Sequence, residues 1–294
     1  RYRTKTMEKY IAKFELILKH LEYHQDEESA SKIISDLACM SKFHFHRLFS
    51  AYAGMSLFAV MKLLRLKRAA YQLAYRQELK VIDIALMAGY DSAAAFSRAF
   101  KRVFLQSPKT FRQKPNWVTW QAHYQSVLTI RSKIMQKDVN FQVSQVSFPE
   151  TSIAVLQHRA SPSLLGNSIA QFIHWRKANG LPPSKSKTFN LIYHDPSTTE
   201  PNKYRFDIAC EIHTEVRENL QGVIHDVIPA GQCAKIRYQG SDDNLALAID
   251  YLYTQWLKKS SKALRDFPLF LARVSLYPDV SEAETITDIY LPIK

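Results

Sequence analysis

The apolar residues in the first third of the chain recur at helical spacing. Apolar side chains at helical spacing form three groups: Ile11, Phe14, Leu18 and Leu21; Ile33, Ile34 and Leu37; and Leu63, Leu64, Leu66 and Leu73. One face of an α-helix repeats with this period. Pro108, Gly54 and Gly89 are the only prolines and glycines before residue 115. We therefore predict an all-helical domain over residues 1–114.

After about residue 138 the pattern changes to short runs of strand length, VNFQVSQVSF, SIAVLQH, RFDIACEI and TITDIYLPI. Two longer helical stretches, residues 164–178 and 242–259, interrupt these runs. The order of strands, helix and two more strands occurs twice, which predicts an α+β domain of two βαββ repeats over residues 139–294. Residues 115–138 form the linker, which we expect to be helical and partly docked.

A short pattern occurs twice in the helical part, as FHFHRLF at residues 43–49 and AAFSRAF at residues 94–100. At 100° per residue, the two phenylalanines of each copy fall on one side of a helix and the arginine falls on the other. We therefore expect Phe45, Phe49, Phe96 and Phe100 to be core anchors. Arg47 and Arg98 would be presented to solvent or to a ligand.

Each copy extends upstream into a short helix and a tight turn before Ser41 or Asp91 and Ser92, which are good N-caps. This is the layout of a helix-turn-helix, whose second helix can enter a major groove. Residues 56–76 contain no proline or glycine and predict a connecting helix of about 31 Å. Successive major-groove faces lie about 34 Å apart, so one chain could fill two of them. The helix could equally pack a bundle core, and both interpretations can hold.

The positive charge is concentrated in the helical part. Residues 1–114 hold 21 Lys and Arg against 10 Asp and Glu, which gives +11 of the total net charge of +13. Such a basic segment is typical of a nucleic-acid-binding domain, although a cationic protein with no nucleic-acid partner would have the same balance.

Other classes of function find little support in the sequence. The three cysteines are far apart without a C-x-x-C pair, and His44 and His46 lie 200° apart on a helix, which rules out a shared metal ion. No phosphate loop, nucleophile elbow or metal cluster is evident, and no apolar run is long enough to span a membrane. We therefore expect a cytoplasmic, nucleoid-associated protein that is not an enzyme and needs neither cofactor nor metal.

Residues 88–112, AGYDSAAAFSRAFKRVFLQSPKTFR, and the earlier stretch MSKFHFHRLFSAYAGMS resemble the signature of AraC/XylS-family transcriptional regulators. The resemblance covers about residues 7–114. It implies a bacterial regulator that binds double-stranded DNA and has RNA polymerase as a further partner. Two positions depart from the family pattern: Cys39 replaces a turn glycine, and Leu105 replaces the glycine before Ser-Pro, which implies a different helix terminus.

Carried over by position, the resemblance assigns base readout to Phe43, His46 and Arg47 of the first recognition helix and to Ala94, Ser97 and Arg98 of the second. Each arginine could bind guanine bidentately or contact a phosphate. Because Ala93, Ala94 and Ala95 make no side-chain hydrogen bonds, we expect the first helix to carry most of the direct readout. The candidate phosphate partners, each of which could instead be a solvated surface residue, are Lys42, Ser50, Lys62, Lys67, Arg68, Lys101, Arg102, Lys109 and Arg112.

The stretches YHDPSTTEPNKYRFDIAC, IPAGQCAKIRYQG and TDIYLPIK resemble the GyrI-like (gyrase-inhibitor-like) effector-binding domain. The resemblance implies a cleft between two βαββ halves that takes a small molecule. In the P-x-x-E-x-Y context of that family, Leu271 stands at the Glu position and Arg273 at the Tyr position. This change argues against a cation pocket and against hydrolysis, and favours an apolar pocket or, through Arg273, an anion. The candidate pocket residues, for which core packing is the alternative, are Phe172, Trp175, Tyr193, Trp256, Phe270, Arg273 and Tyr290.

The sequence thus predicts a sequence-specific DNA-binding regulator with two recognition helices in adjacent major grooves and an effector of unknown identity in the C-terminal domain. The alternative is an architectural or weakly specific DNA binder whose C-terminal domain serves in protein contacts. The alanine-rich second helix and the missing glutamate lean toward this alternative.

Overall fold

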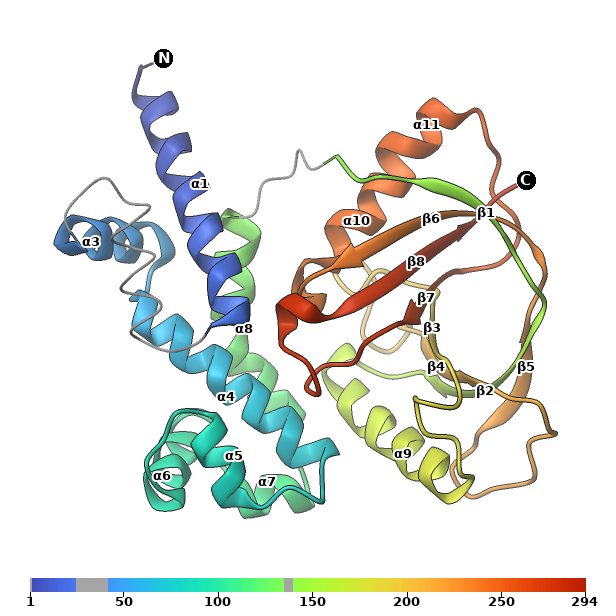
Figure 1. The fold of residues 1–294 in the computed structure, drawn as a ribbon, viewed down its shortest axis with the longest axis horizontal. Coiled ribbons are helices and arrows are strands. Elements are labelled where there is room, and N and C mark those ends of the chain that lie inside the picture. The colour runs from blue at the N-terminus through green and yellow to red at the C-terminus, as the bar shows by residue number, and fades with distance from the viewer. Residues whose placement is uncertain (1, 25–41, 135–139) are drawn as a thin grey trace. The chain divides into compact units, whose positions relative to one another are not determined.

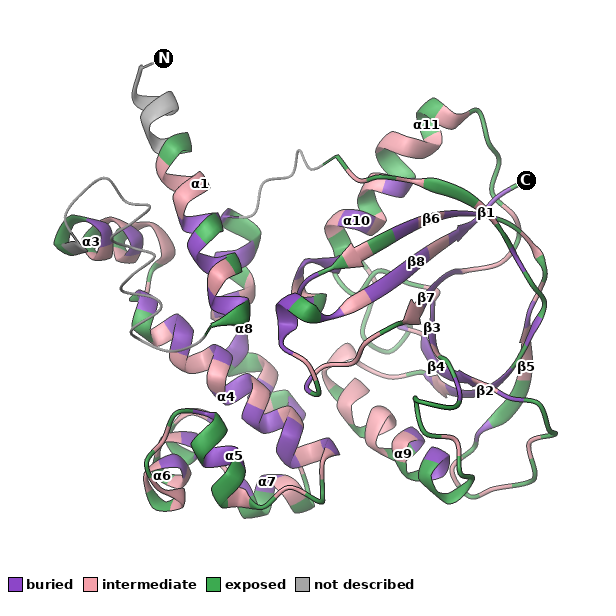
Figure 2. Ribbon diagram, in the orientation of Figure 1, coloured by how far each residue is buried: buried purple, intermediate pink, exposed green. Residues whose placement is uncertain are grey.

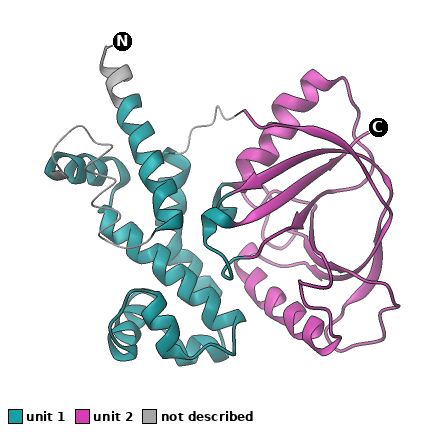
Figure 3. Ribbon diagram, viewed as in Figure 1, with its two compact units in different colours: residues 1–139, 240–244, 277–284 teal, residues 140–239, 245–276, 285–294 magenta. Residues whose placement is uncertain are grey.

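The structure is a computed structural model that describes residues 2–24, 42–134 and 140–294 (Figure 1). The chain divides into two compact units (Figure 3). Unit 1 comprises residues 1–139 together with two later segments, 240–244 and 277–284. Unit 2 comprises residues 140–239, 245–276 and 285–294. Two pieces of the C-terminal half therefore belong to the helical unit.

Up to residue 134, the described residues of unit 1 form helices joined by short connections, as predicted for residues 1–114. Its helices are α1 (Tyr2–Tyr23), α3 (Lys42–Ala53), α4 (Leu57–Tyr75), α5 (Val81–Met87), α6 (Ala93–Phe104), α7 (Pro108–Gln113) and α8 (Trp117–Ile134). The helix expected before the first recognition helix, with Ile34, Leu37 and Cys39, lies outside the described residues, as does the predicted N-cap Ser41.

Helix α4 has the limits that the sequence predicts. The Ser56 hydroxyl caps its first turn by accepting from the Ala59 amide at 3.2 Å, and the helix ends before Arg76. At 1.5 Å per residue its 19 residues span about 28 Å. Leu57, Val60 and Leu64 are among its fully buried residues, so α4 is also a core helix.

The second helix-turn-helix consists of α5, a turn and α6. Gly89 supplies the turn with a φ of +77°, a conformation that residues with a Cβ rarely adopt. Ser92 then caps α6 by accepting from the Ala95 amide at 3.2 Å. Phe96, Phe100 and Phe104 are buried one turn apart, and this stripe orients the helix.

The C-terminal end of α6 differs from the prediction made for Leu105, which stands where the AraC/XylS pattern has glycine. Leu105 takes the left-handed conformation, with φ 59° and ψ 7°, and donates its amide to the Lys101 carbonyl. The helix terminus is therefore of the usual left-handed kind, and the expected difference was wrong. The Leu105 side chain is 66% exposed, so packing does little to offset the steric cost of this conformation.

The residues expected to form a linker are mostly a core helix of unit 1. Trp117, Trp120 and Tyr124 of α8 are buried. The Trp120 ring stacks on Tyr124 at 5.2 Å and meets Tyr71 of α4 edge-on at 5.6 Å. Large aromatic rings packed in this way contribute strongly to a core.

A buried ion network lies inside unit 1 and consists of Glu22, Lys67, Arg131, Asp243 and Glu282. Lys67 Nζ lies 2.9 Å from Asp243 Oδ2 and 2.8 Å from Glu282 Oε1. Arg131 Nη2 donates to Glu282 Oε2 at 2.8 Å, and its Nη1 lies 3.1 Å from Asp243 and 3.3 Å from Glu22 without an aligned hydrogen bond. Asp243 and Glu282 come from the two later segments of the chain.

The network contains three carboxylates and two cations, and its pKa values reflect this imbalance. Burial raises the pKa of Glu22 to about 7, against the opposing effect of Arg131. Burial also disfavours the charged form of Glu282, but Lys67 and Arg131 outweigh it and hold that pKa well below its usual range. Glu22 is therefore the carboxyl that keeps a proton near neutral pH.

Unit 2 is built on one antiparallel sheet of eight strands with the order β1-β6-β8-β7-β3-β4-β2-β5. The strands are β1 (Ser144–Phe148), β2 (Thr151–His158), β3 (Thr188–Ile192), β4 (Phe206–Glu211), β5 (Ile224–Ile228), β6 (Gly231–Gln239), β7 (Leu269–Arg273) and β8 (Ile286–Pro292). Helix α9 (Leu165–Ala178) follows β2, and α10 (Leu245–Tyr251) follows β6 and continues through a π-helical turn into α11 (Leu257–Ser260). The two predicted βαββ repeats are confirmed, and each long helix starts within three residues of its predicted start.

The two faces of the sheet carry different cores. On one face, α9 packs on a cluster that includes Ile208 and Cys210, and α10 packs on a cluster that includes Leu271 and Ile289. On the opposite face the sheet curls around a third cluster, which we call the aromatic interior (Figure 1). Its buried members are Phe148, Ile153, Val155, Phe189, Leu191, Ala209, Ile228, Cys233 and Phe270, and Val146, Tyr193, Phe267, Ala272 and Tyr290 pack against them.

Among the described helices, none is individually long and apolar enough to cross a membrane. One pair of helical segments together has the length and apolar composition of a membrane span: Phe43–Ala53 and Leu57–Tyr75. The two segments are bent by 65° at the break between them.

Replacing Leu105 with glycine is expected to raise the free energy of unfolding by about 1 kcal/mol, because glycine adopts the left-handed conformation without steric cost. Urea denaturation measures the change. Leu105→Ala keeps the strained backbone and should stay within about 0.5 kcal/mol of wild type. Equal effects of the two substitutions would contradict the explanation.

The raised pKa of Glu22 makes stability depend on pH. The folded state holds a proton between pH 4.5 and about 7 that the unfolded state has released, so this contribution to stability is lost as pH rises through 7. Between pH 5 and 8 the loss should be about 2 kcal/mol. Glu22→Gln should remove this part of the pH dependence in urea titrations, whereas the exposed Glu8→Gln should leave it unchanged.

Candidate functional site

The first recognition helix, α3, presents its predicted faces. Phe45 and Phe49 are fully buried and meet the Phe14 ring of α1 edge-on at 5.6 and 5.3 Å. Phe43, which is 76% exposed, and Arg47, which is also exposed, lie on the side of the helix opposite these two rings. Figure 2 shows buried and exposed positions along α3. The packing of the two phenylalanines thus turns Phe43 and Arg47 outward.

The remaining α3 candidates are less open. His46 is half-buried, and its ring stacks on Phe58 of α4 at 5.2 Å, so it packs against protein as well as facing solvent. Ser50 is also half-buried. The side chain of Lys42 lies outside the described part of the structure.

The second recognition helix, α6, exposes Ala94, Arg98 and Lys101 along one stripe, with Ser97 half-buried within it. Arg102 is exposed beside this stripe. Residues three and four apart are neighbours on a helix, so these side chains form one surface. The predicted readout residues of α6 therefore share a face.

The other basic candidates divide into surface and structural residues. Lys109 is exposed on α7, but Arg112 donates through Nη2 to the Leu79 carbonyl at 2.7 Å and thereby ties α7 to the loop before α5. Arg68 lies 3.4 Å from the Pro278 carbonyl. Lys67 was expected to be a phosphate partner, and this was wrong: it is 5% exposed and committed to the buried ion network.

The structure brings together three of the seven predicted pocket residues. Tyr193, Phe270 and Tyr290 all belong to the aromatic interior. Phe270 and Tyr290 stack at 5.0 Å with an angle of 8° between their rings, and Phe148 meets both edge-on. These residues are candidates for contacts with a bound molecule.

The other four candidates lie on the opposite face of the sheet. Phe172 and Trp175 are buried in the cluster under α9, and Trp256 packs on the cluster under α10. Arg273 donates to the Asn190 side-chain oxygen at 2.8 Å and to the Thr287 hydroxyl at 3.1 Å. Because side chains alternate along a strand, Arg273 shares the face of Leu271 and cannot share that of Phe270.

Two carboxylates in the aromatic interior escaped the sequence-based prediction. Asp207 is two residues from Ala209 on β4, and Asp288 is two residues from Tyr290 on β8, so both face the interior. Asp207 is fully buried and Asp288 is 4% exposed. The signal in the sequence was an aspartate in the middle of each apolar run, RFDIACEI and TITDIYLPI.

These carboxylates occupy equivalent positions in the two halves. Asp207 pairs with Gln157 across β4 and β2, and Asp288 pairs with Arg237 across β8 and β6. Gln157 and Arg237 each stand four residues before a serine that opens a 3-10 turn, Ser161 and Ser241.

Each carboxylate is already paired with a basic side chain of the chain itself. Arg205 binds Asp207 through two hydrogen bonds of 3.1 and 2.7 Å and lies 3.7 Å over the Tyr193 ring. Lys235 lies 2.8 Å from Asp288 and 5.4 Å over the Tyr290 ring. Burial raises the pKa of Asp288, but bonds from Arg237 and Lys235 outweigh it and leave the pKa below its usual value.

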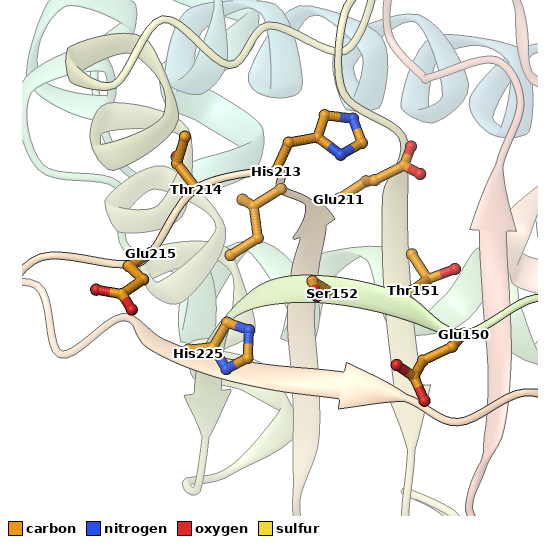
Figure 4. A pocket seen from close by; sticks show the side chains of 9 residues that line it. Glu150, Thr151, Ser152, Glu211, His213, Thr214, Glu215 and His225 are labelled. Carbon is orange, nitrogen blue, oxygen red and sulfur yellow. The ribbon is translucent and has the colours of Figure 1, made fainter.

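A separate, polar pocket of about 470 Å³ lies at the ends of β2, β4 and β5 (Figure 4). Its lining is Glu150, Thr151, Ser152, Glu211, Ile212, His213, Thr214, Glu215 and His225. None of these residues belongs to the aromatic interior. Within the described residues, no three His, Cys, Asp or Glu side chains are placed to hold a metal ion.

Comparison with protein families matches both parts of the chain. Residues 141–294 match the GyrI-like small-molecule-binding domain, and residues 34–114 match a helix-turn-helix domain. The first match covers more than half of the chain. The chain belongs to the GyrI-like family. The helix-turn-helix match supports the resemblance of the N-terminal part to AraC-type regulators.

Two curated relatives each match a portion of the chain. The GyrI-like part is 34% identical over 157 residues to the probable transcriptional regulator YgiV of Escherichia coli K12. The matched residues make up 53% of this chain and 98% of YgiV. The helix-turn-helix part is 34% identical over 101 residues to the right origin-binding protein of the same bacterium, covering 34% of this chain and 35% of that protein.

Among solved structures, the chain is similar to EcmrR in a complex with DNA. The similarity has a TM-score of 0.44 and 16% identity, over 84% of this chain and 98% of EcmrR. The isolated C-terminal domain of EcmrR has a TM-score of 0.44 and 20% identity, over 53% of this chain and 99% of that domain.

The two sides of α3 should respond differently to truncation. Phe45→Ala removes a fully buried ring and should lower the free energy of unfolding by about 3–5 kcal/mol. Phe43→Ala removes an exposed ring and should change it by less than about 0.5 kcal/mol. Chemical denaturation of both variants checks the assignment, and a large loss for Phe43→Ala would contradict it.

Proposed function

We propose that the chain is a sequence-specific DNA-binding transcriptional regulator whose α3 and α6 enter adjacent major grooves and whose GyrI-like domain binds a small molecule. One observation carries the DNA-binding part. Before and after α4 stands a helix with two phenylalanines buried at i and i+4 and an arginine exposed between them. The length of α4, about 28 Å, is compatible with the spacing of successive grooves.

The exposed residues divide into those suited to base contacts and those suited to phosphate contacts. Arg47 and Arg98 supply guanidinium groups for guanine or phosphate, and Phe43 offers an apolar surface for a thymine methyl group. His46 is restrained by its stacking on Phe58, so we assign it a smaller part in readout than Arg47. Lys101, Arg102 and Lys109 are exposed and suit phosphate contacts that position the protein without specifying sequence.

The small-molecule part of the proposal is supported by the family and by the aromatic interior. Tyr193, Phe270 and Tyr290 are its proposed contact residues. Phe172, Trp175, Trp256 and Arg273 face the other side of the sheet and are not among them. We propose no catalytic role, since YgiV is named as a probable transcriptional regulator. RNA polymerase as a partner and a cytoplasmic location at the nucleoid follow from regulation of transcription.

An architectural, weakly specific DNA binder is the second candidate, and α6 is the observation that favours it. Ala94 is exposed at the start of α6 beside half-buried Ala93 and Ala95, so this end of the helix makes no side-chain hydrogen bonds to bases. Selection of bound DNA from a random library at a stated salt concentration separates the two candidates. A regulator should enrich two sequence blocks one helical turn apart, with a preference of about 10³-fold or more.

Two substitutions should then act differently on the selected site. Arg47→Ala should weaken binding by about 1–3 kcal/mol and relax the preference at one base position, because it removes a base contact. Arg102→Ala should weaken all sequences alike and reduce the slope of log K against log salt by about 1. Fluorescence anisotropy at several salt concentrations measures both effects. If Arg47→Ala behaves like Arg102→Ala, Arg47 contacts phosphate only.

A further inference from the structure

The helical unit that carries both recognition helices also contains residues 277–284. This segment lies in the connection between β7 and β8, the strands that place Phe270 and Tyr290 in the aromatic interior. A short stretch of chain therefore joins the proposed ligand contacts directly to the unit that holds α3 and α6.

The segment is attached along α4 by four kinds of contact. Arg76 donates to Asp279 through two hydrogen bonds of 2.6 Å, one to each carboxylate oxygen. Nearer the middle of the helix, the Tyr71 and Tyr277 rings meet at 5.2 Å, and Arg68 lies 3.4 Å from the Pro278 carbonyl. Lys67 then pairs with Glu282 in the buried ion network. The contacts run over about three turns of α4.

These contacts differ in what they can contribute. Removing one partner of the buried Lys67–Glu282 pair would leave a charge buried without its counterion, which is strongly destabilising. The Arg76–Asp279 pair is more open, with side chains 21% and 51% exposed, and contributes little to stability. Its bidentate geometry nevertheless fixes the position of Asp279 against the last turn of α4.

We propose that the β7–β8 connection positions α4, and that Asp279 is the residue through which a change in the aromatic interior reaches the recognition helices. The inference rests on the proposed function as a DNA-binding regulator. A shift of β7 or β8 moves residues 277–284, these move the C-terminal turns of α4, and α4 sets the separation of α3 from α6. Because site-specific binding needs both helices in register with the grooves, it responds to the shift.

Asp279→Asn in the whole two-unit chain tests the proposal, because two explanations predict changes in DNA affinity of opposite sign. Loss of a negative charge from the basic unit would by itself strengthen DNA binding. Loss of the Arg76 pair should instead weaken binding to the selected site by about 3- to 30-fold, the range of measured coupling energies. Affinity for unrelated DNA should change less than twofold.

Two further variants serve as controls. Glu78→Gln makes the same charge change at an exposed residue two positions beyond Arg76 and should not lower site affinity. The charge-reversed double variant Arg76→Asp with Asp279→Arg should recover most of the affinity that Asp279→Asn loses. Thermal melts of each variant show whether the fold is retained.

Each outcome decides the proposal. Weaker site binding with unchanged melting, together with recovery in the reversed pair, supports it. Unchanged or stronger site binding by Asp279→Asn overturns it, as does an equal loss for the selected site and unrelated DNA. If the wild-type protein prefers no sequence at all, the proposed function fails first, and that failure is visible before any variant is made.

Discussion

The buried ion network is the interaction on which the helical unit depends. Lys67 and Arg131 are 5% and 3% exposed, so neither cation can rely on water. Their acidic partners come from α1 and from two segments that follow residue 239, and the two carboxylates that stay charged, Asp243 and Glu282, lie in those later segments. A buried charge without its partner costs about 3–5 kcal/mol, a large part of the stability of an ordinary domain. The DNA-binding unit is therefore completed by residues from the far end of the sequence.

The limits of the helices in this unit can be predicted from local sequence, whereas the distant residues that pair with their buried charges cannot. The limits of α4 and α6 follow from local signals: the Ser56 and Ser92 caps, the apolar period and Gly89. Lys67 shares the inward stripe of α4 with Leu64 and Tyr71 at helical spacing, so its burial had a local signal. Its partner Asp243 is 176 residues away, and no local pattern identifies a contact of that range.

The C-terminal site shows a different limit of prediction from sequence. The strands follow from the alternation of apolar and polar residues, and both helices follow from the length of their apolar patterns. Residue type alone predicts pocket residues without specifying which face of the sheet they occupy. Phe270 and Leu271 are adjacent on β7 and must point to opposite sides. Leu271 lies in the core under α10, so the residue at the family's glutamate position says nothing about charge in the aromatic interior. Asp207 and Asp288 supply that charge from other strands.

The pairing of these carboxylates constrains what the aromatic interior can bind. Arg205 and Lys235 each cover a tyrosine ring and neutralise an aspartate, which is the chemistry that a bound organic cation would use. Arg205 and Lys235 belong to the same chain as the aspartates they bind. Each therefore competes with a bound cation at an effective concentration of the order of millimolar or above. A cation must displace Arg205 to reach Asp207, and both Lys235 and Arg237 to reach Asp288, whereas an uncharged aromatic molecule meets rings such as Phe270 and Tyr290 without displacing these groups. Phe270 and Tyr290 pair directly across β7 and β8, the two strands whose connection continues into residues 277–284.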